Sequence, residues 1–353
     1  MKPPNKKFPS IDPRKFLREY GVESLSDFIR ARTGYVCQVR PLNILAEQLD
    51  SGIPGLYEGK RGGGKTAKAK AVGEAFNQPV FYVQCTTGVG FAEMLYEWDR
   101  AAQTFAVEQY LRDGFTHADA RAQTWTREFL MLGEVLAAYD AAASAGCGLP
   151  VVFFTSNNMR SGVSSPLRSR CLYSYIEEPS SPEEIRILRS RVPGVGFELL
   201  GQVVKLSHFI RGMGSVVEKP GLRESISLLK ALVRKGIVDL DVNIIDRHLG
   251  YIAKTEKDEK NLNGQTLTLL NQVAHTKHTQ IDGWTRDACQ EVLPEASSFL
   301  CPVEMHGTLP ILIMDEVDKF SETDEDKVLQ LTGDGYASVP RLLPDSRIGI
   351  FQL

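Results

Sequence analysis

The stretch Gly59-Lys60-Arg61-Gly62-Gly63-Gly64-Lys65-Thr66 fits the pattern GxxxxGKT, which is typical of a phosphate-binding loop. Backbone N–H groups can approach phosphate oxygens where no side chain intrudes, at Gly59, Gly62, Gly63 and Gly64. We expect Lys65 to contact the β- and γ-phosphates of a nucleotide and Thr66 to hold Mg²⁺, with the positive end of the following helix pointing at the anion. The motif therefore predicts binding of ATP and Mg²⁺.

Apolar runs alternate with helical patterns on both sides of this loop. Runs typical of strands occur at Ile53–Tyr57, before the loop, and then at 79–85, 151–155, 172–176 and 309–314. Between them, Ala67–Phe76 and the stretches 92–112 and 126–145 have the composition of helices. Strands that alternate with helices predict an α/β fold with a parallel sheet, in which ligands bind at the carboxyl ends of the strands.

The chain divides into five parts by composition. From Ser181-Pro182-Glu183-Glu184, a helix start with proline and acids in its first turn, the pattern becomes helical throughout. Lys254–Asn263 is charged, and the residues after it have no clear period. We therefore expect an N-terminal helical segment, a nucleotide-binding core, a helical lid, a linker and a last segment that completes the core, at residues 1–50, 51–179, 180–254, 255–308 and 309–353.

Hydrolysis requires acids at a strand end, and the sequence offers one such pair. Asp315 ends an apolar run and would bind Mg²⁺, while Glu316 would orient and deprotonate the attacking water. Two acids where a buried strand meets solvent are also common without any catalytic role. The apolar strands at 79–85 and 151–155, however, end in Gln84-Cys85 and Thr155-Ser156, and neither supplies a carboxylate for Mg²⁺. The sequence therefore predicts that Asp315 lies beside Thr66.

Three further residues are weaker candidates. Asn157 follows the strand at 151–155 and could contact the γ-phosphate or the attacking water, although Ser-Asn-Asn is also ordinary turn chemistry. Arg170 lies just before the next strand and could reach a neighbouring subunit's nucleotide. Arg223 lies in the first turn of a predicted lid helix and could reach the phosphates. Each of the two arginines could equally be a solvated surface residue.

The composition excludes several other kinds of protein. With 41 basic and 44 acidic residues the net charge is −3, which argues against a nucleic acid partner, and no apolar stretch is long enough to cross a membrane. Six scattered cysteines and the lack of a signal-peptide core indicate a cytoplasmic protein with reduced thiols. Five histidines and cysteines could be considered as zinc ligands, but their spacing fits no zinc-finger pattern: His275, His278, Cys289, Cys301 and His306.

These motifs together resemble AAA+ ATPases of the MoxR-like group, over roughly residues 40–254 and 309–353. By that resemblance Lys65 and Thr66 are Walker A residues, and Asp315 and Glu316 are the Walker B pair. Asn157 matches the first sensor, Arg170 an arginine finger and Arg223 the second sensor of the lid. The resemblance implies a ring oligomer, in most cases a hexamer, that remodels client proteins. Many such proteins insert a metal or cofactor into an enzyme and work with a von Willebrand A-type partner.

The order of the motifs departs from that family, because Walker B normally lies between Walker A and the first sensor. Here it follows the lid. In one explanation the segment Gly307–Leu353 inserts into the sheet of its own chain beside Val151–Phe154. In a second, the segment docks poorly or onto a neighbouring subunit, and the ATPase is impaired. A rearranged sequence is the third explanation. We favour insertion, because Ile311–Met314 would otherwise be exposed.

The main functional hypothesis is an ATP-driven remodeller of proteins. One alternative is a DNA-associated motor or clamp loader, which Ser169-Arg170-Cys171 suggests. The other is a scaffold that binds nucleotide without hydrolysing it.

Overall fold

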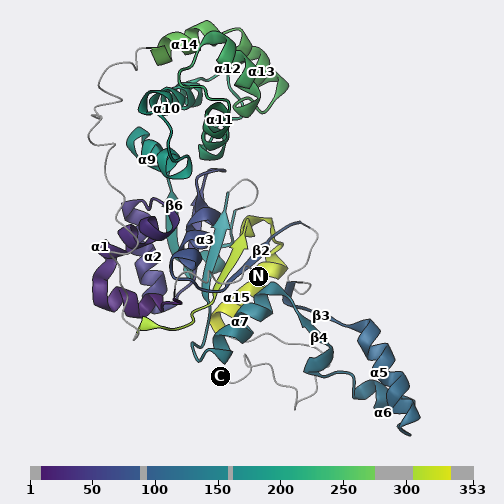
Figure 1. Cartoon of the computed structure of the whole chain (residues 1–353). Coiled ribbons are helices and arrows are strands. Elements are labelled where there is room, and N and C mark those ends of the chain that lie inside the picture. Colours follow the sequence, from purple (N-terminus) through teal and green to yellow (C-terminus); the bar gives the residue numbers. More distant parts are fainter. Residues whose placement is uncertain (1–8, 88–93, 158–161, 275–304, 335–353) are drawn as a thin grey trace.

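The structure is a computed structural model that describes residues 9–87, 94–157, 162–274 and 305–334 (Figure 1). It comprises a parallel sheet flanked by helices, a helical bundle and a projecting arm. No helix among the described residues is long and apolar enough to cross a bilayer. The strands of the main sheet are β1 (Gly55–Gly59), β2 (Val80–Gln84), β5 (Val151–Ser156), β6 (Leu172–Ile176) and β7 (Ile311–Asp315).

Strand β7 lies inside the sheet, between β2 and β5, although it is the last of the described strands along the chain. The order is β2-β7-β5-β1-β6, and all four pairings are parallel. Ile311 is in register with Val151 of β5 on one side and with Val80 of β2 on the other. This confirms the prediction that Ile311–Met314 pairs in parallel with Val151–Phe154. Figure 1 shows β7 in yellow among strands that come much earlier in the chain.

Helices cover both faces of the sheet, and β7 contributes to the cores on both sides. The covering helices are α1 (Pro13–Thr33), α2 (Val39–Ser51), α3 (Lys65–Ala75), α7 (Glu134–Ser144), α8 (Ser165–Ser169) and α15 (Glu322–Asp334), the last of which follows the short helix η7 (Val317–Lys319). Ile311 and Ile313 belong to the cluster under α1, α2 and α3, whereas Leu312 and Met314 belong to the cluster under α7 and α15. All four side chains are at most 1% exposed, as expected for a strand buried on both faces.

The amide of Gln78 joins the segment that enters β7 to the N-terminal part of the chain. Its Nε2 donates to Ile11 O at 2.5 Å and to Gly307 O at 3.0 Å, and its Oε1 accepts from Leu309 N at 2.7 Å. Ser10 Oγ also donates to Gly307 O at 2.9 Å. Gln78 is 3% exposed, so these bonds form in the interior, where an unpaired amide would be costly. They fix the point at which β7 enters the sheet.

The lid is a helical bundle that extends further than the sequence indicates. It consists of α9 (Ser181–Arg191), α10 (Phe197–Gly212), α11 (Leu222–Arg234), α12 (Val242–His248), η2 (Leu249–Tyr251), α13 (Glu256–Asn263) and α14 (Thr266–Ala274). Leu262 of α13 and Leu269 of α14 are completely buried, in the same cluster as Leu200 and Val204 of α10. The interpretation of Lys254–Asn263 as a linker was therefore wrong: most of the charges in this stretch lie on the solvent side of a helix.

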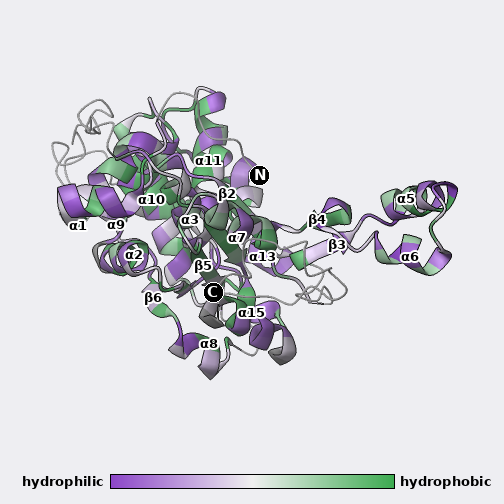
Figure 2. Cartoon of the chain, turned by 90° about the horizontal axis from the view of Figure 1, so that it is seen from below, coloured by the Kyte–Doolittle hydropathy of each residue, from purple (hydrophilic) through white to green (hydrophobic). Residues whose placement is uncertain are grey.

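A two-stranded antiparallel stem carries a helical arm away from the sheet (Figures 1 and 2). The elements are β3 (Tyr96–Trp98), α5 (Arg100–Arg112), α6 (His117–Ala122), η1 (Arg127–Phe129) and β4 (Leu130–Leu132). The stem interrupts two stretches predicted as single helices, 92–112 and 126–145, so both predictions were wrong in part. Trp98 and Leu130 pair across the stem and are buried, and Trp125 packs against Trp98, which explains why these residues leave the helical pattern.

Candidate nucleotide-binding site

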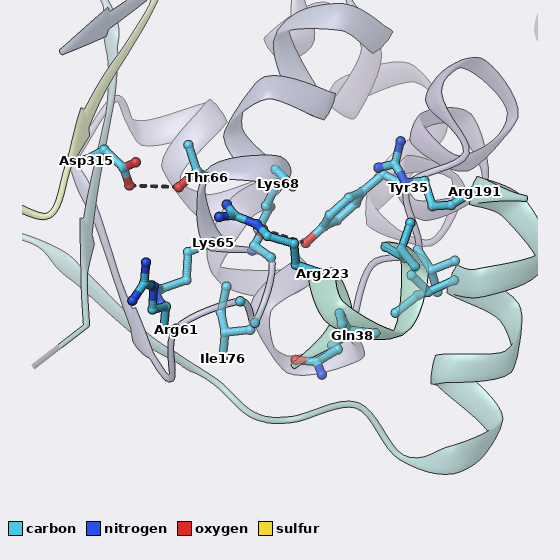
Figure 3. A pocket seen from close by; sticks show the side chains of 18 of the residues that line it. Tyr35, Gln38, Arg61, Lys65, Thr66, Lys68, Ile176, Arg191, Arg223 and Asp315 are labelled. Carbon is cyan, nitrogen blue, oxygen red and sulfur yellow. Dashed lines mark hydrogen bonds between the residues drawn. The ribbon is translucent and has the colours of Figure 1, made fainter. Parts of the chain in front are cut away.

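A cavity of about 750 Å³ lies at the carboxyl ends of the central strands. Its walls are the glycine loop, the N-terminal segment around Tyr35, lid helices α9 and α11, and the ends of β2, β5 and β7. Figure 3 shows Lys65, Thr66, Asp315 and Arg223 on its sides. The cavity is therefore formed by sheet and lid together, at the edge where parallel sheets bind ligands.

The glycine loop has the backbone that a phosphate cradle needs. Gly62 and Gly64 have φ values of 81° and 90°, which side-chain-bearing residues rarely adopt. A Cβ at Gly59 would lie 2.4 Å from Ile176 O, so this position must also be glycine. Lys65 Nζ donates to the carbonyls of Gly59 and of Lys60, both at 2.8 Å, and so folds over the loop. Burial lowers the pKa of Lys65, although the carboxylate of Asp315 opposes this effect.

Asp315 lies beside Thr66, which confirms the predicted proximity. Thr66 Oγ1 donates to Asp315 Oδ1 at 2.7 Å (Figure 3). Thr155, at the end of β5, donates to the same oxygen, and Tyr82 donates to Asp315 Oδ2 at 2.7 Å. Three hydroxyl groups from three different elements thus orient one carboxylate toward the start of α3.

The next residue, Glu316, is oriented by donors from both sides. Asn157 Nδ2 donates to its Oε1 at 2.8 Å and Gln84 Nε2 to its Oε2 at 2.8 Å, while Lys319 forms an ion pair with Oε2. Its backbone is left-handed, with φ 59° and ψ 49°, which costs about 1–2 kcal/mol in a residue that is not glycine. Strained backbone of this kind is concentrated at functional sites, and Glu316 lines the same cavity as Asn157 and Gln84.

The two arginine candidates occupy different environments. Arg223, in the first turn of α11, lines the cavity. Nearby, Gly221 approaches the glycine loop so closely that a Cβ would lie 3.4 Å from Arg61 O. Arg170, in contrast, is exposed, is not among the residues that line the cavity, and donates to Pro166 O at 3.2 Å. The structure thus brings Arg223, but not Arg170, to the site within one chain.

Sequence reasoning missed four side chains that contact the acid pair: Tyr82, Gln84, Thr155 and Lys319. Tyr82 and Gln84 occupy the end of β2, where no motif marks them. Their role depends on β7 pairing with β2 in the register Gln84↔Asp315, and only the structure supplies that register. Among the zinc candidates, His306 lies by Ser10 O, and the others fall outside the described residues: His275, His278, Cys289 and Cys301.

One end of the cavity contains an amine with an unusual environment. Lys68, one turn after the glycine loop, is 2% exposed; its Nζ donates to Pro41 O at 2.6 Å and lies 4.2 Å from the centre of the Tyr57 ring. Burial lowers the pKa of Lys68 to about 7. Tyr35 and Cys37 line the cavity beside it.

The oxygen donors around Thr66 suit magnesium. Mg²⁺ prefers hard oxygen ligands and is commonly held by one or two protein groups together with substrate phosphates. Thr66 and Asp315 provide a hydroxyl and a carboxylate in direct contact. Among the described residues no group of three or more histidine, cysteine or acidic side chains could enclose a metal by itself. The donor set therefore fits an ion shared with a nucleotide rather than a metal caged by the protein.

Comparison of the sequence with models of protein families gave no match, and comparison with curated proteins gave none either. The function of the site is therefore inferred from its own residues.

Proposed function

We propose that this chain is an ATPase that binds ATP with Mg²⁺ in the cavity between the sheet and the lid. The observation that carries the proposal is the 2.7 Å hydrogen bond between Thr66 and Asp315. It joins the end of the glycine loop to the acid of a strand that lies 249 residues further along the chain. Phosphoryl transfer to water requires groups that bind the phosphates and groups that hold Mg²⁺. The glycine cradle and the hydroxyl–carboxylate pair provide them at one edge of the sheet.

Each residue has a distinct part in the proposed reaction. The backbone of Gly62–Gly64 and the amine of Lys65 bind phosphate oxygens, and Thr66 and Asp315 hold Mg²⁺, which neutralises charge on the phosphates when it is bound. Glu316 accepts the proton of the attacking water, and the amide of Asn157 fixes the direction of that carboxylate. Arg223 adds positive charge from the lid. The lid can therefore respond to the phosphates through Arg223.

We also propose, from the resemblance to AAA+ ATPases of the MoxR-like group, that the chain works in a hexameric ring and remodels protein clients. The α/β core followed by a helical bundle, with Arg223 in the shared cavity, supports this. Arg170 is exposed on the surface of the core, as a residue that acts on a neighbouring subunit's nucleotide must be. The position of Glu316 in the cavity favours hydrolysis over a purely structural use of nucleotide.

A pair of substitutions tests the proposed ATPase. Lys65→Ala removes a phosphate contact, so ATP binding and turnover should both be lost. Glu316→Gln keeps the shape of the side chain but removes the basic carboxylate, so ATP should still bind while turnover falls at least about 100-fold. Circular dichroism of both variants should match the unchanged protein. Wild-type turnover in Lys65→Ala would refute the assignment of the loop.

A further inference from the structure

The hydroxyl of Tyr82 faces two acceptors, although it carries a single proton. Its oxygen lies 2.7 Å from Asp315 Oδ2 and 2.6 Å from Gln84 Oε1. A tyrosine hydroxyl can donate only one hydrogen bond at a time. One of the two acceptors is therefore without the Tyr82 proton at any moment.

The orientation of the Gln84 amide is determined by its other neighbour. Gln84 Nε2 donates to Glu316 Oε2 at 2.8 Å, and an ionised carboxylate can only accept. The amide must therefore present its nitrogen to Glu316 and its oxygen to Tyr82. A continuous path of polar contacts thus runs from Asp315 through Tyr82 and Gln84 to Glu316.

The position of Tyr82 favours a hydroxyl that changes direction without movement of the ring. Lys70 Nζ lies 4.1 Å from the centre of the ring, and Tyr82 occupies the paired part of β2 opposite Ile313. The strand and the cation hold the ring, and only rotation about the C–O bond is needed to move the proton from one acceptor to the other. This rotation requires no change in protein backbone.

We propose that Tyr82 is a positioning residue that couples the metal-side acid Asp315 to the water-side acid Glu316 of the proposed ATPase. When a cation occupies the oxygens of Asp315, the Tyr82 proton turns to Gln84 Oε1. The amide of Gln84 is then fixed by bonds at both ends, and Glu316 is held in one direction. Without the cation the proton returns to Asp315, and the Gln84 amide loses one of its two bonds. This inference rests on the proposed function, because it assigns roles to the same site.

Metal affinity tests the coupling without measuring turnover. The probe is Mn²⁺, titrated by electron paramagnetic resonance into the full-length chain saturated with ADP. Gln84→Met removes the alternative acceptor, so Tyr82 should donate to Asp315 permanently and compete with the metal. We expect Mn²⁺ to bind about 3- to 10-fold more weakly, the loss of part of one hydrogen bond. In the Tyr82→Phe background there is no hydroxyl to redirect, and Gln84→Met should change Mn²⁺ affinity less than about twofold.

A matched control is available at another tyrosine. Tyr173 donates to the carboxylate of Glu58 at 2.9 Å but does not line the cavity, so Tyr173→Phe should leave the effect of Gln84→Met on Mn²⁺ binding intact. An equal effect of Gln84→Met with and without the Tyr82 hydroxyl would overturn the coupling, and so would the absence of any effect. Failure of the unchanged protein to bind ADP would instead overturn the proposed function, and a direct binding titration made first distinguishes the two outcomes.

Discussion

Truncation of side chains on β7 tests whether this strand stabilises both sides of the sheet. Leu312 lies between Phe81 and Val152 in the core under α7, and Ile313 faces the opposite core under α3. Their exposures are 1% and 0%. Replacing either by alanine removes about three buried carbons, worth about 0.8 kcal/mol each, and the remaining cavity raises the total to about 3–5 kcal/mol.

Urea denaturation followed by tryptophan fluorescence measures this loss, because Trp98 belongs to the same cluster as Leu312. Leu267→Ala is the control, since this leucine is 66% exposed and its truncation should change stability by less than about 0.5 kcal/mol. A typical domain has only about 5–15 kcal/mol of stability, so both core variants should unfold at clearly lower urea concentrations. A loss below about 1 kcal/mol at either position would show that the strand is not buried between β2 and β5.

Three other predictions concern the ring, the C-terminal segment and the lid. Arg170→Ala should reduce ATP turnover at least about 100-fold without weakening ATP binding. Mixing Arg170→Ala subunits with Glu316→Gln subunits should restore part of the turnover. No recovery in rings shown to contain both subunits would contradict action of Arg170 across an interface. Deleting Gly307–Leu353 should give a protein that aggregates in gel filtration and releases no phosphate from ATP. A well-folded, active product would contradict the fold. Burial would raise the pKa of Glu184, but hydrogen bonds from His208 and Arg211 outweigh it and lower the pKa to about 2. The stability that these bonds contribute is complete above about pH 5 and is lost as the pH falls toward about 2. The free energy of unfolding of Glu184→Gln, measured by urea denaturation at each pH, should therefore vary less over that range than that of the unchanged protein. An unchanged pH dependence in Glu184→Gln would contradict this.

The local sequence predicted those features that depend on short-range chemistry. The glycines of the loop themselves determine its backbone conformation. An apolar run that ends in Asp315-Glu316 can bury its apolar side chains and still present its acids at a strand end only as a strand inside a sheet. From that argument the pairing of β7 with β5 was predicted correctly, against the usual order of such motifs. Strand length and composition were sufficient because an apolar strand that is buried on both faces can only lie between two other strands of a sheet.

The missed features depend on contacts between distant segments. The three-residue strands β3 and β4 are too short to show a period, and the surrounding residues favour helix, so the arm was not predicted. In α13 only Asp258 and Leu262 are buried, and one buried apolar side chain among charges gives no periodic signal. Tyr82 and Gln84 acquire their partners only when β7 is inserted beside β2, which β2 itself does not encode.

The most direct test of the central claim is the Mg²⁺ dependence of ATP turnover in Asp315→Asn. The claim is that the late strand β7 supplies the acid that works with Thr66 of the glycine loop. Asparagine has nearly the same shape but no charge, so ADP should bind within about threefold of the unchanged protein in the absence of Mg²⁺. Mg²⁺-stimulated turnover should fall at least about 100-fold, equivalent to about 2.7 kcal/mol of transition-state stabilisation. Wild-type turnover with normal Mg²⁺ dependence in Asp315→Asn would show that the acid comes from elsewhere and that β7 does not complete the site.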